Sequence, residues 1–534
     1  MAKILLYLLI SMIQPGATCL HGFEQRCHDL QPERIIPGTT LNILQFVSSN
    51  TTLMLEDNDI TCNRKAQVTS ANICRVALTI KTSMQSSIVF EAWLPKHWNG
   101  RFLATGNGGI DGCIKYEDLA YTSSQGFAAV GANNGHNGTG GLPFYNHPDT
   151  VIDFAWRSLH TSADVGKQLT KALYGTPHSK SYYLGCSLGG RQGIGNAEKF
   201  PSDFDGIVAG APGVDFNNLY SWRAHFFPLT GAIGSRDSVT SNAWKTWIHD
   251  EVLKQCDMID GVEDGIIENP GLCDFDPSRL LCAGNSTNNC LTQPQVLRLR
   301  QIYSDYKYPN GHTIFPAMQP GSEVNAADGL YAGTAWKPSE DWFKYVVYND
   351  PSWNASRFNF EDAAVAERLN PGDIRTFPSL LSRFERRGGK LLIFHGRQDN
   401  QITSFNSDRF YKHLKGQRSY TDMDKWVRYF QISGMNHCST GPGAWVLGQG
   451  GNAAAAGIPF QAENNVLKAM VDWVEQSVAP EHMQGTKFVN DSVALGVDFK
   501  RRHCRYPLYN AYIGGDHKNA SSWECGHGIT TGKP

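Results

Sequence analysis

A short glycine-rich stretch with a serine at its centre constrains this chain more than any other feature. Gly185-Cys186-Ser187-Leu188-Gly189 follows a short apolar run, residues 182–184, and precedes a helical pattern over residues 188–200. Glycines on both sides of a serine allow the backbone to turn sharply from a strand into a helix, which exposes the hydroxyl. The pentapeptide is also compatible with an ordinary glycine turn, so its interpretation as a nucleophile depends on partners elsewhere in the chain.

Strand-like and helix-like segments alternate on both sides of this stretch. Residues 76–80 and 87–94 are β-rich runs around a polar turn, which predicts a hairpin. Buried-strand patterns follow at 102–104, 127–131, 182–184, 206–210, 390–394 and 427–432, and helical patterns at 154–174, 188–200 and 463–478. This alternation predicts an α/β fold with a mostly parallel central sheet flanked by helices.

The alternation stops between residues 214 and 388, a region with two short cysteine loops and several tryptophans. We therefore expect a discontinuous main domain, residues 20–213 and 389–534, interrupted by an inserted second domain over residues 214–388.

The N-terminus predicts export. Lys3, an apolar run over residues 4–13 and small residues after it are typical of a signal peptide, which we assign to residues 1–19. Of the 13 cysteines, Cys19 lies at the expected cleavage boundary, which leaves an even number for pairing. Glycosylation sequons lie at Asn50, Asn137, Asn285, Asn354, Asn490 and Asn519.

Charge and hydropathy exclude two classes of partner. The formal net charge is -2, without a long run of Lys and Arg, so we expect no nucleic-acid partner. No later apolar run approaches the roughly 20 residues that a transmembrane helix needs, so we expect no membrane partner. The sequence therefore predicts a secreted, extracellular protein, either a monomer or a homodimer.

A nucleophilic serine needs a histidine base and a carboxylate that orients it. Asp399 follows the strand pattern at 390–394, and His437 follows the one at 427–432. Parallel strands bring their carboxyl ends to one edge of a sheet, so these residues are expected to meet Ser187 there. The order Ser187, Asp399, His437 is typical of α/β-hydrolases.

Other residues compete for these roles. His395 and His136 also lie in glycine-rich loops, and Asp408 and Asp424 also precede His437. We favour His437 as the base because the carboxylate precedes it and no acidic residue lies between it and Glu463.

Two cysteines strengthen the assignment. Cys186 directly precedes the serine and Cys438 directly follows the histidine, a coincidence expected by chance only about 6 times in 10,000. A disulfide holds its Cβ atoms roughly 3.8 Å apart, so a bridge between them would bring Ser187 and His437 within hydrogen-bond range.

An oxyanion hole needs two donors. The N–H of Leu188, the residue after the nucleophile, is the expected first donor, and the second is expected from the loop Gly106-Asn107-Gly108-Gly109, with Gly108 and Gly109 as candidates.

A separate acidic loop lies in the insert. Asp257, Asp260 and Asp264 alternate with glycines, a composition suited to a hard cation, although the spacing is not that of an EF-hand. Cys256 and Cys273 bracket the loop. We favour a structural calcium site there over a solvated acidic turn, and we expect it to serve stability rather than chemistry.

With these motifs in hand, the chain resembles the fungal tannase and feruloyl esterase family over nearly its whole mature length. The resemblance lies in residues 185–193, in His395-Gly396 with Asp399 and Ile402, in Gly434-Met435 with His437-Cys438, and in the loop 257–266. It implies an α/β-hydrolase domain with a large inserted lid, and the triad Ser187, Asp399 and His437.

The resemblance also implies ligands and crosslinks. Calcium would be held by the side chains of Asp257, Asp260 and Asp264 and by the carbonyls of Val262 and Ile266. The implied disulfides are Cys186–Cys438, Cys27–Cys74, Cys62–Cys113, Cys256–Cys273, Cys282–Cys290 and Cys504–Cys525. Many relatives have a tryptophan where this chain has Arg397, which predicts a changed environment for Asp399.

We therefore expect a secreted serine esterase that needs no organic cofactor. The resemblance implies phenolic acyl groups, with hydroxycinnamates such as ferulate favoured over gallate, and a small aromatic, polysaccharide-linked or tannin-linked ester as substrate. The alternatives are a non-catalytic binding protein on a hydrolase fold and a serine carboxypeptidase, which shares the triad order.

Overall fold

The structure is a computed structural model, and it describes residues 22–284, 288–451 and 457–527. The predicted signal segment 1–19, Cys19 and the sequon at Asn285 lie outside these ranges. Within the described ranges, no helix combines the length and the apolar character needed to cross a bilayer.

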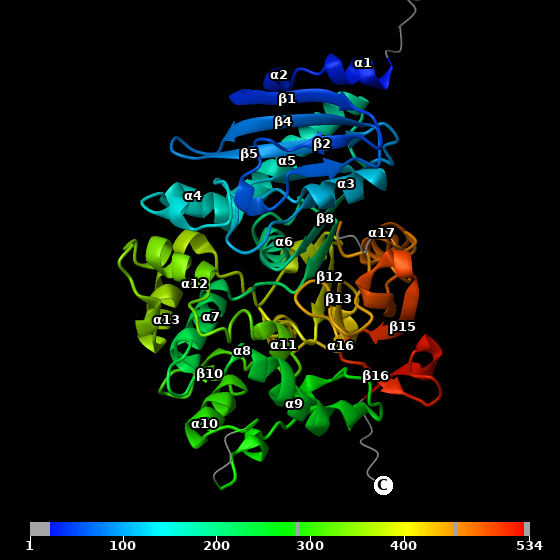
Figure 1. The fold of residues 1–534 in the computed structure, drawn as a ribbon. Helices are drawn as coiled ribbons and strands as arrows, with labels where there is room; N and C mark the ends of the chain where they lie inside the picture. Colours follow the sequence, from blue (N-terminus) through cyan, green and yellow to red (C-terminus); the bar gives the residue numbers. More distant parts are fainter. Residues whose placement is uncertain (1–21, 285–287, 452–456, 528–534) are drawn as a thin grey trace, which may run out of the picture.

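A nine-stranded sheet runs from the top of the molecule in Figure 1, at β1, to its middle, at β12 and β13, in the order β1-β4-β5-β7-β6-β8-β9-β12-β13. Its strands are β1 (Thr39–Val47), β4 (Ile73–Lys81), β5 (Ser87–Pro95), β6 (Arg101–Thr105), β7 (Ala128–Ala132), β8 (Lys180–Cys186), β9 (Gly206–Gly210), β12 (Lys390–Gly396) and β13 (Val427–Ile432). Neighbours are antiparallel from β1 to β7 and parallel from β7 to β13. The predicted hairpin and the predicted mostly parallel sheet are both confirmed.

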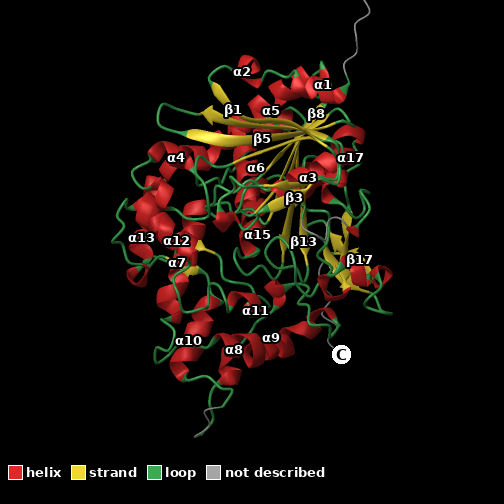
Figure 2. Ribbon diagram, turned by 45° about the horizontal axis from the view of Figure 1, so that its top comes forward, coloured by secondary structure: helices red, strands yellow, loops and turns green. Residues whose placement is uncertain are grey.

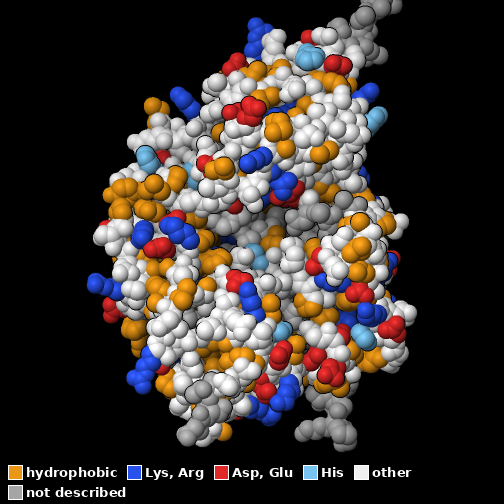
Figure 3. Space-filling view, in the orientation of Figure 1, with side chains coloured by type: hydrophobic (Ala, Val, Ile, Leu, Met, Phe, Trp, Pro, Cys, Tyr) orange, Lys and Arg blue, Asp and Glu red, His pale blue; other side chains and the backbone are white. Residues whose placement is uncertain are grey.

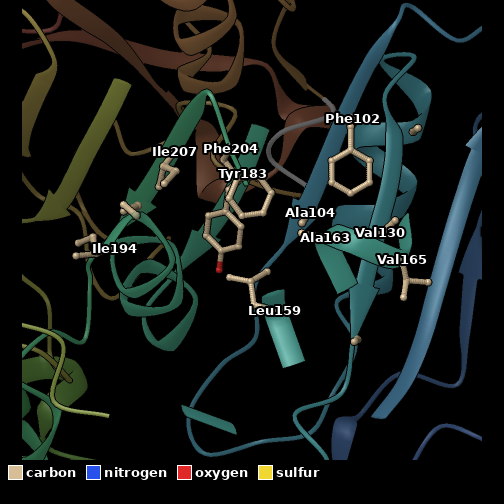
Figure 4. Packing of buried hydrophobic residues seen from close by; sticks show 14 of the residues in the cluster. Phe102, Ala104, Val130, Leu159, Ala163, Val165, Tyr183, Ile194, Phe204 and Ile207 are labelled. Atoms are coloured by element: carbon tan, nitrogen blue, oxygen red, sulfur yellow. The ribbon is translucent and has the colours of Figure 1, made fainter. Parts of the chain in front are cut away.

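Helices cover both faces of the sheet because successive strand residues point to opposite sides. Phe102, Ala104 and Tyr183 share a core with α5 (Ser158–Tyr174), α6 (Leu188–Lys199) and α15 (Phe405–Lys415). Leu103 and Tyr182 instead share a core with α17 (Val466–Gln476). Figure 4 shows Tyr183 between Phe204 and Leu159, and Phe102 beside Val130. The two cores hold the parallel strands, and hence their carboxyl ends, in fixed positions.

Two predicted helices differ at their first residues. The pattern at 154–174 resolves into a π-helical turn, Asp153–Arg157, followed by α5, which ends at Gly175 with φ +74°. The pattern at 463–478 becomes a helix only at Val466, because the side chain of Asn465 accepts the N–H groups of Leu467 and Lys468.

The insert, residues 214–388, has one core that most of its helices share, whereas Phe384 near its end packs in the core that contains α5 and α6. Its helices are α7 (Phe216–Thr230), α8 (Ser241–Ala243), α9 (His249–Cys256), α10 (Gln293–Ile302), α11 (Glu323–Ala326), α12 (Lys337–Trp342), α13 (Phe360–Leu369) and α14 (Ser382–Arg386), and its strands are β10 (Tyr306–Lys307) and β11 (Thr313–Phe315). Figures 1 and 2 place most of these helices together, away from β1 and β4. Phe144 and Phe154, outside the insert, pack with Phe216 and Trp342 inside it. The insert is therefore anchored to the main body by aromatic packing.

The remaining elements lie around the edges. They are α1 (Phe23–His28), α2 (Pro32–Ile35), β2 (Thr52–Met54), β3 (Ala66–Val68), α3 (Tyr116–Ser124), α4 (Pro148–Ile152), α16 (Tyr420–Met423), β14 (His482–Phe488), β15 (Val497–Cys504), β16 (Tyr509–Tyr512) and β17 (Trp523–Gly526).

Candidate active site

Ser187 lies in the sharp turn between β8 and α6. Its backbone is strained, with φ 65° and ψ -122°. The turn is fixed because the N–H of Ser187 donates to the carbonyl of Gly210 (2.9 Å) and its own carbonyl accepts the N–H of Gly213 (3.0 Å). A Cβ at Gly185 would lie 2.6 Å from the Tyr183 hydroxyl and 2.9 Å from the Gly189 carbonyl carbon, so only glycine fits there.

The three predicted triad residues lie in hydrogen-bond contact. Nε2 of His437 is 2.8 Å from Oγ of Ser187, and Nδ1 of His437 is 2.6 Å from Oδ2 of Asp399. The three residues come from loops after β8, β12 and β13, at the carboxyl ends of parallel strands. This geometry allows His437 to accept a proton from the serine while Asp399 orients the ring.

Asp399 is fully buried yet charged. Its Oδ1 accepts the N–H groups of Gln401 (2.7 Å) and Ile402 (2.8 Å). Burial opposes the charge, but the charge of His437 and hydrogen bonds from His395 and His437 outweigh it and hold the pKa of Asp399 well below its ordinary value. Asp399 therefore stays ionised across the neutral pH range.

His395 contacts the same carboxylate, a contact that the sequence reasoning did not assign. Its Nε2 lies 3.1 Å from Oδ2 of Asp399 and 3.0 Å from the carbonyl of Ile402, and its Nδ1 lies 2.7 Å from the Ser407 hydroxyl. A proton on Nε2 satisfies the two oxygens, and Nδ1 then accepts from Ser407. The only sequence signal was the spacing of four residues between His395 and Asp399.

The two alternative carboxylates, Asp408 and Asp424, form ion pairs with arginines and do not contact His437 in the described contacts. Asp408 pairs with Arg397 at 3.0 Å and accepts from Tyr429 and Gln431, and Asp424 pairs with Arg428 at 2.9 Å. Arg397, expected to change the environment of Asp399, is directed to Asp408 and has no ion pair with Asp399 among the described contacts.

The alternative histidine, His136, also has another partner. His136 is buried against Phe144, with its Nε2 3.0 Å from the Ile110 carbonyl. It has no contact with Ser187 among the described residues.

A disulfide joins the two loops that carry Ser187 and His437. Cys186 and Cys438 are bonded, with their Cα atoms 6.1 Å apart. The other bridges, Cys27–Cys74, Cys62–Cys113, Cys256–Cys273, Cys282–Cys290 and Cys504–Cys525, are the same pairs that the family resemblance implied.

The candidate oxyanion donors differ in availability. The N–H of Gly108 is directed to Oδ1 of Asp111 at 3.3 Å. Among the described residues, the N–H groups of Leu188 and Gly109 have no hydrogen-bond partner. The loop is tied to α6 because the N–H of Gly189 donates to the carbonyl of Asn107 (2.9 Å). The N–H groups of Leu188 and Gly109 are therefore available to donate, whereas that of Gly108 is already directed to Asp111.

A small polar cavity of about 270 Å³ opens beside Ser187. The glycine loop, the bridge Cys186–Cys438 and His437 form part of its wall, and Lys115, Glu117, Asp118, Gln401 and Gln449 form the rest. The front face of the molecule is hollowed across its middle, at the height of α6 in Figure 1 (Figure 3).

The acidic loop of the insert has unsatisfied oxygens. Oδ1 of Asp257 and Oδ2 of Asp260 are buried without hydrogen-bond partners. Burial and the charge of Glu268 raise the pKa of Asp260 to about 7. Asp264 pairs with Arg501 at 2.7 Å. Within the described ranges, no three His, Cys, Asp or Glu side chains converge closely enough to hold a metal ion, so the predicted three-aspartate convergence is not seen.

The sheet, the strained serine turn and the hydrogen-bonded site together define an ester hydrolase of the α/β-hydrolase fold. A family model described as tannase and feruloyl esterase matches residues 74–526. The chain belongs to this family, whose members are carboxylic ester hydrolases.

Two curated relatives and three solved structures illustrate the similarity. A probable feruloyl esterase B-2 from Aspergillus flavus is 54% identical over 91% of this chain and 94% of its own length, and one from Aspergillus terreus is 46% identical over 97% and 99%. The crystal structure of an esterase from Aspergillus oryzae is 45% identical, with a TM-score of 0.91 over 94% of this chain and 100% of its own. Feruloyl esterase B from the same organism is 41% identical, with a TM-score of 0.91 over 95% of this chain and 100% of its own. Tannin acyl hydrolase from Aspergillus niger, at 20% identity and a TM-score of 0.72 over 95% of both chains, shares the fold.

Proposed function

We propose that this protein is a feruloyl esterase that hydrolyses esters of hydroxycinnamic acids, using Ser187 as nucleophile. The observation that carries the proposal is the unbroken hydrogen-bonded series from Ser187 through His437 to Asp399. The high identity to relatives named feruloyl esterase B supports the choice of acyl group.

The reaction begins at the serine hydroxyl. Nε2 of His437 takes the proton as Oγ attacks the ester carbonyl, and the ionised Asp399 stabilises the imidazolium that forms. His437 then returns the proton to the departing alcohol, which leaves an acyl-enzyme. Water activated by the same histidine releases the phenolic acid, so the cycle needs no organic cofactor.

The tetrahedral intermediates carry a negative oxygen that needs donors. We assign the N–H groups of Leu188 and Gly109 to this role, because the N–H of Gly108 is already directed to Asp111. Tyr220 of the insert donates to the carbonyl of Gly109 at 3.0 Å, which connects the insert to this loop.

An assay of four esters tests the acyl preference: methyl ferulate, methyl caffeate, methyl gallate and a short-chain nitrophenyl ester. We expect the highest kcat/KM on a hydroxycinnamate, whereas a preference for gallate would identify a tannase. Ser187→Ala should lose at least about 10⁴-fold in kcat.

A fluorophosphonate probe tests whether the protein is an enzyme at all. It should label Ser187 of the folded protein. Absence of labelling would favour a non-catalytic binding protein, and hydrolysis of peptides without hydrolysis of esters would favour a carboxypeptidase.

We further propose that residues 214–388 act as a lid domain and hold a structural calcium ion through two of the three expected aspartates, Asp257 and Asp260, together with backbone carbonyls, because Asp264 is paired with Arg501. The orphaned oxygens of Asp257 and Asp260 support the ion, as do the carbonyls of Val262 and Ile266, which accept no hydrogen bond among the described residues. Carboxylate and carbonyl oxygens are the ligands that Ca²⁺ prefers. The ion would neutralise buried charge and take no part in ester cleavage.

We also propose that the protein is secreted and glycosylated. Six disulfides suit an oxidising compartment. The described sequon asparagines are all exposed: Asn50, Asn137, Asn354, Asn490 and Asn519.

A further inference from the structure

Among the described residues, the cavity beside Ser187 has no aromatic or aliphatic side chain in its wall apart from His437 and the disulfide Cys186–Cys438. Its side chains are mostly charged or amide groups, including Lys115, Glu117 and Gln401. A phenolic ring is best held between apolar or aromatic side chains, whereas a group with several hydroxyls needs hydrogen-bonding partners. The alcohol half of an ester such as a sugar ester has that character.

Some of the polar groups in the wall are already satisfied. Asp118 accepts the N–H of Gly451 at 2.6 Å. The amide of Gln449 accepts the N–H of Leu447 and donates to the carbonyls of Trp445 and Cys438. Gln449 therefore shapes the wall but has little capacity left for a ligand, whereas Oδ2 of Asp118 has no described partner.

Glu117 and Gln401 are among the wall side chains that keep unused hydrogen-bonding capacity, as does Lys115, whose Nζ lies 3.7 Å from Asp111. Glu117 pairs with Arg64 through Oε2 at 3.0 Å, and its Oε1 has no described partner. Gln401 is fixed by its backbone, whose N–H donates to Asp399 and whose carbonyl accepts from Arg223 at 2.9 Å. Among the described residues, its side-chain amide has no hydrogen-bond partner, and Gln401 is one of the residues that line the cavity. A fixed backbone with a free amide is a good platform for recognising a hydroxyl.

A second hollow shares one lining residue, Glu117, with this cavity. Its volume is about 360 Å³, and Gln67, Tyr121 and Gln125 also line it. An aromatic ring among amide side chains is suited to an additional sugar unit, because the ring can pack on an apolar sugar face while the amides bind hydroxyls.

We propose that Glu117 and Gln401 are specificity-determining residues that bind the hydroxyl groups of a sugar in the alcohol half of the ester. The proposal rests on the proposed function, since it assumes a feruloyl ester as substrate. It predicts faster hydrolysis of feruloyl sugars than of feruloyl esters of simple alkyl alcohols.

The test compares kcat/KM for feruloyl arabinose with kcat/KM for methyl ferulate in the same preparation. In Glu117→Gln we expect the ratio of the two values to fall about tenfold, as is typical for loss of a charged hydrogen-bond partner. Gln401→Ala should lower it several-fold, and this variant breaks no ion pair. Glu524→Gln, an exposed glutamate on β17, is the matched control and should keep the wild-type ratio.

The outcomes separate the two ideas. If wild-type protein hydrolyses neither feruloyl ester, the proposed function is overturned and the inference with it. If it hydrolyses both and neither variant changes the ratio, the inference alone is overturned. A changed ratio of methyl caffeate to methyl ferulate, with the sugar ratio unchanged, would place the phenolic ring in this cavity and also overturn the inference.

Discussion

Removing the disulfide between the two catalytic loops should impair turnover more than folding. Cys186 precedes Ser187, and Cys438 follows His437. The change is the double substitution Cys186→Ala and Cys438→Ala. It leaves the other five bridges in place.

The stability effect follows from the length of chain that the bridge closes. The two cysteines are 252 residues apart, for which the loop-entropy relation gives about 5.5 kcal/mol as an upper value. The remaining sheet contacts and bridges restrict the unfolded chain as well, so we expect a smaller loss and a folded variant.

The effect on catalysis follows from the short contact that the bridge maintains. Nε2 of His437 lies 2.8 Å from Oγ of Ser187, and a displacement of about 1 Å at such a contact costs roughly 100-fold in rate. We therefore expect kcat on methyl ferulate to fall about 100-fold, measured well below the melting temperature. Labelling by a fluorophosphonate should slow in parallel.

A second bridge provides the matched control. Cys504→Ala with Cys525→Ala opens a bridge across 21 residues at the C-terminal hairpins, for which the same relation gives about 3 kcal/mol. This variant should lose melting temperature but keep kcat. If the folded Cys186/Cys438 variant keeps wild-type kcat, the bridge does not position the catalytic loops and the reasoning is wrong.

Three further changes have defined outcomes. Gly106→Ala places a Cβ 2.3 Å from the Tyr183 hydroxyl and 2.6 Å from Cα of Gly189. Such overpacking should lower the free energy of unfolding by about 1–3 kcal/mol, measured as a lower melting temperature. An unchanged melting temperature would contradict the close packing. The pKa of Asp399 is lower in the folded protein than in the unfolded chain. The charge of Asp399 therefore stabilises the fold at pH values above its pKa in the unfolded chain, and this contribution is lost as the pH falls through its pKa in the folded protein. The stability difference between wild type and Asp399→Asn, measured by denaturant titration, should therefore be largest above about pH 5 and shrink towards about pH 2; a difference that grows in acid would refute this sign. Chelation of calcium should lower the melting temperature of wild type, because a ligand at about 100 times its Kd adds about 2.7 kcal/mol to the free energy of unfolding. The same treatment should have little effect on Asp260→Asn. An unchanged melting temperature of wild type, with no bound metal, would count against the site.

Features that depend on neighbours in the chain were predictable from the sequence. The turn at Ser187 requires glycines at fixed offsets, and the strands require apolar runs that end in polar residues, so the sheet and the positions of Ser187, Asp399 and His437 in its loops could be predicted. The cysteines beside Ser187 and His437 added a long-range constraint that is rare in a single sequence. The first residues of helices were not predictable to the residue: the pattern placed one helix start at residue 463, whereas the cap at Asn465 places it at Val466.

Features that depend on packing between distant segments were decided only by the tertiary structure. The sequence left Gly108 and Gly109 equivalent, and the fold separates them because Asp111 reaches the N–H of Gly108. His395 was a competitor for the base, and the register of β12 directs its ring to Asp399 instead. The polar cavity has the same origin: Glu117 and Gln401 are nearly three hundred residues apart in the chain and line one space only because the sheet order and the loop conformations bring them there. Local sequence specifies backbone turns and burial, whereas such contacts depend on the summed packing of the whole chain.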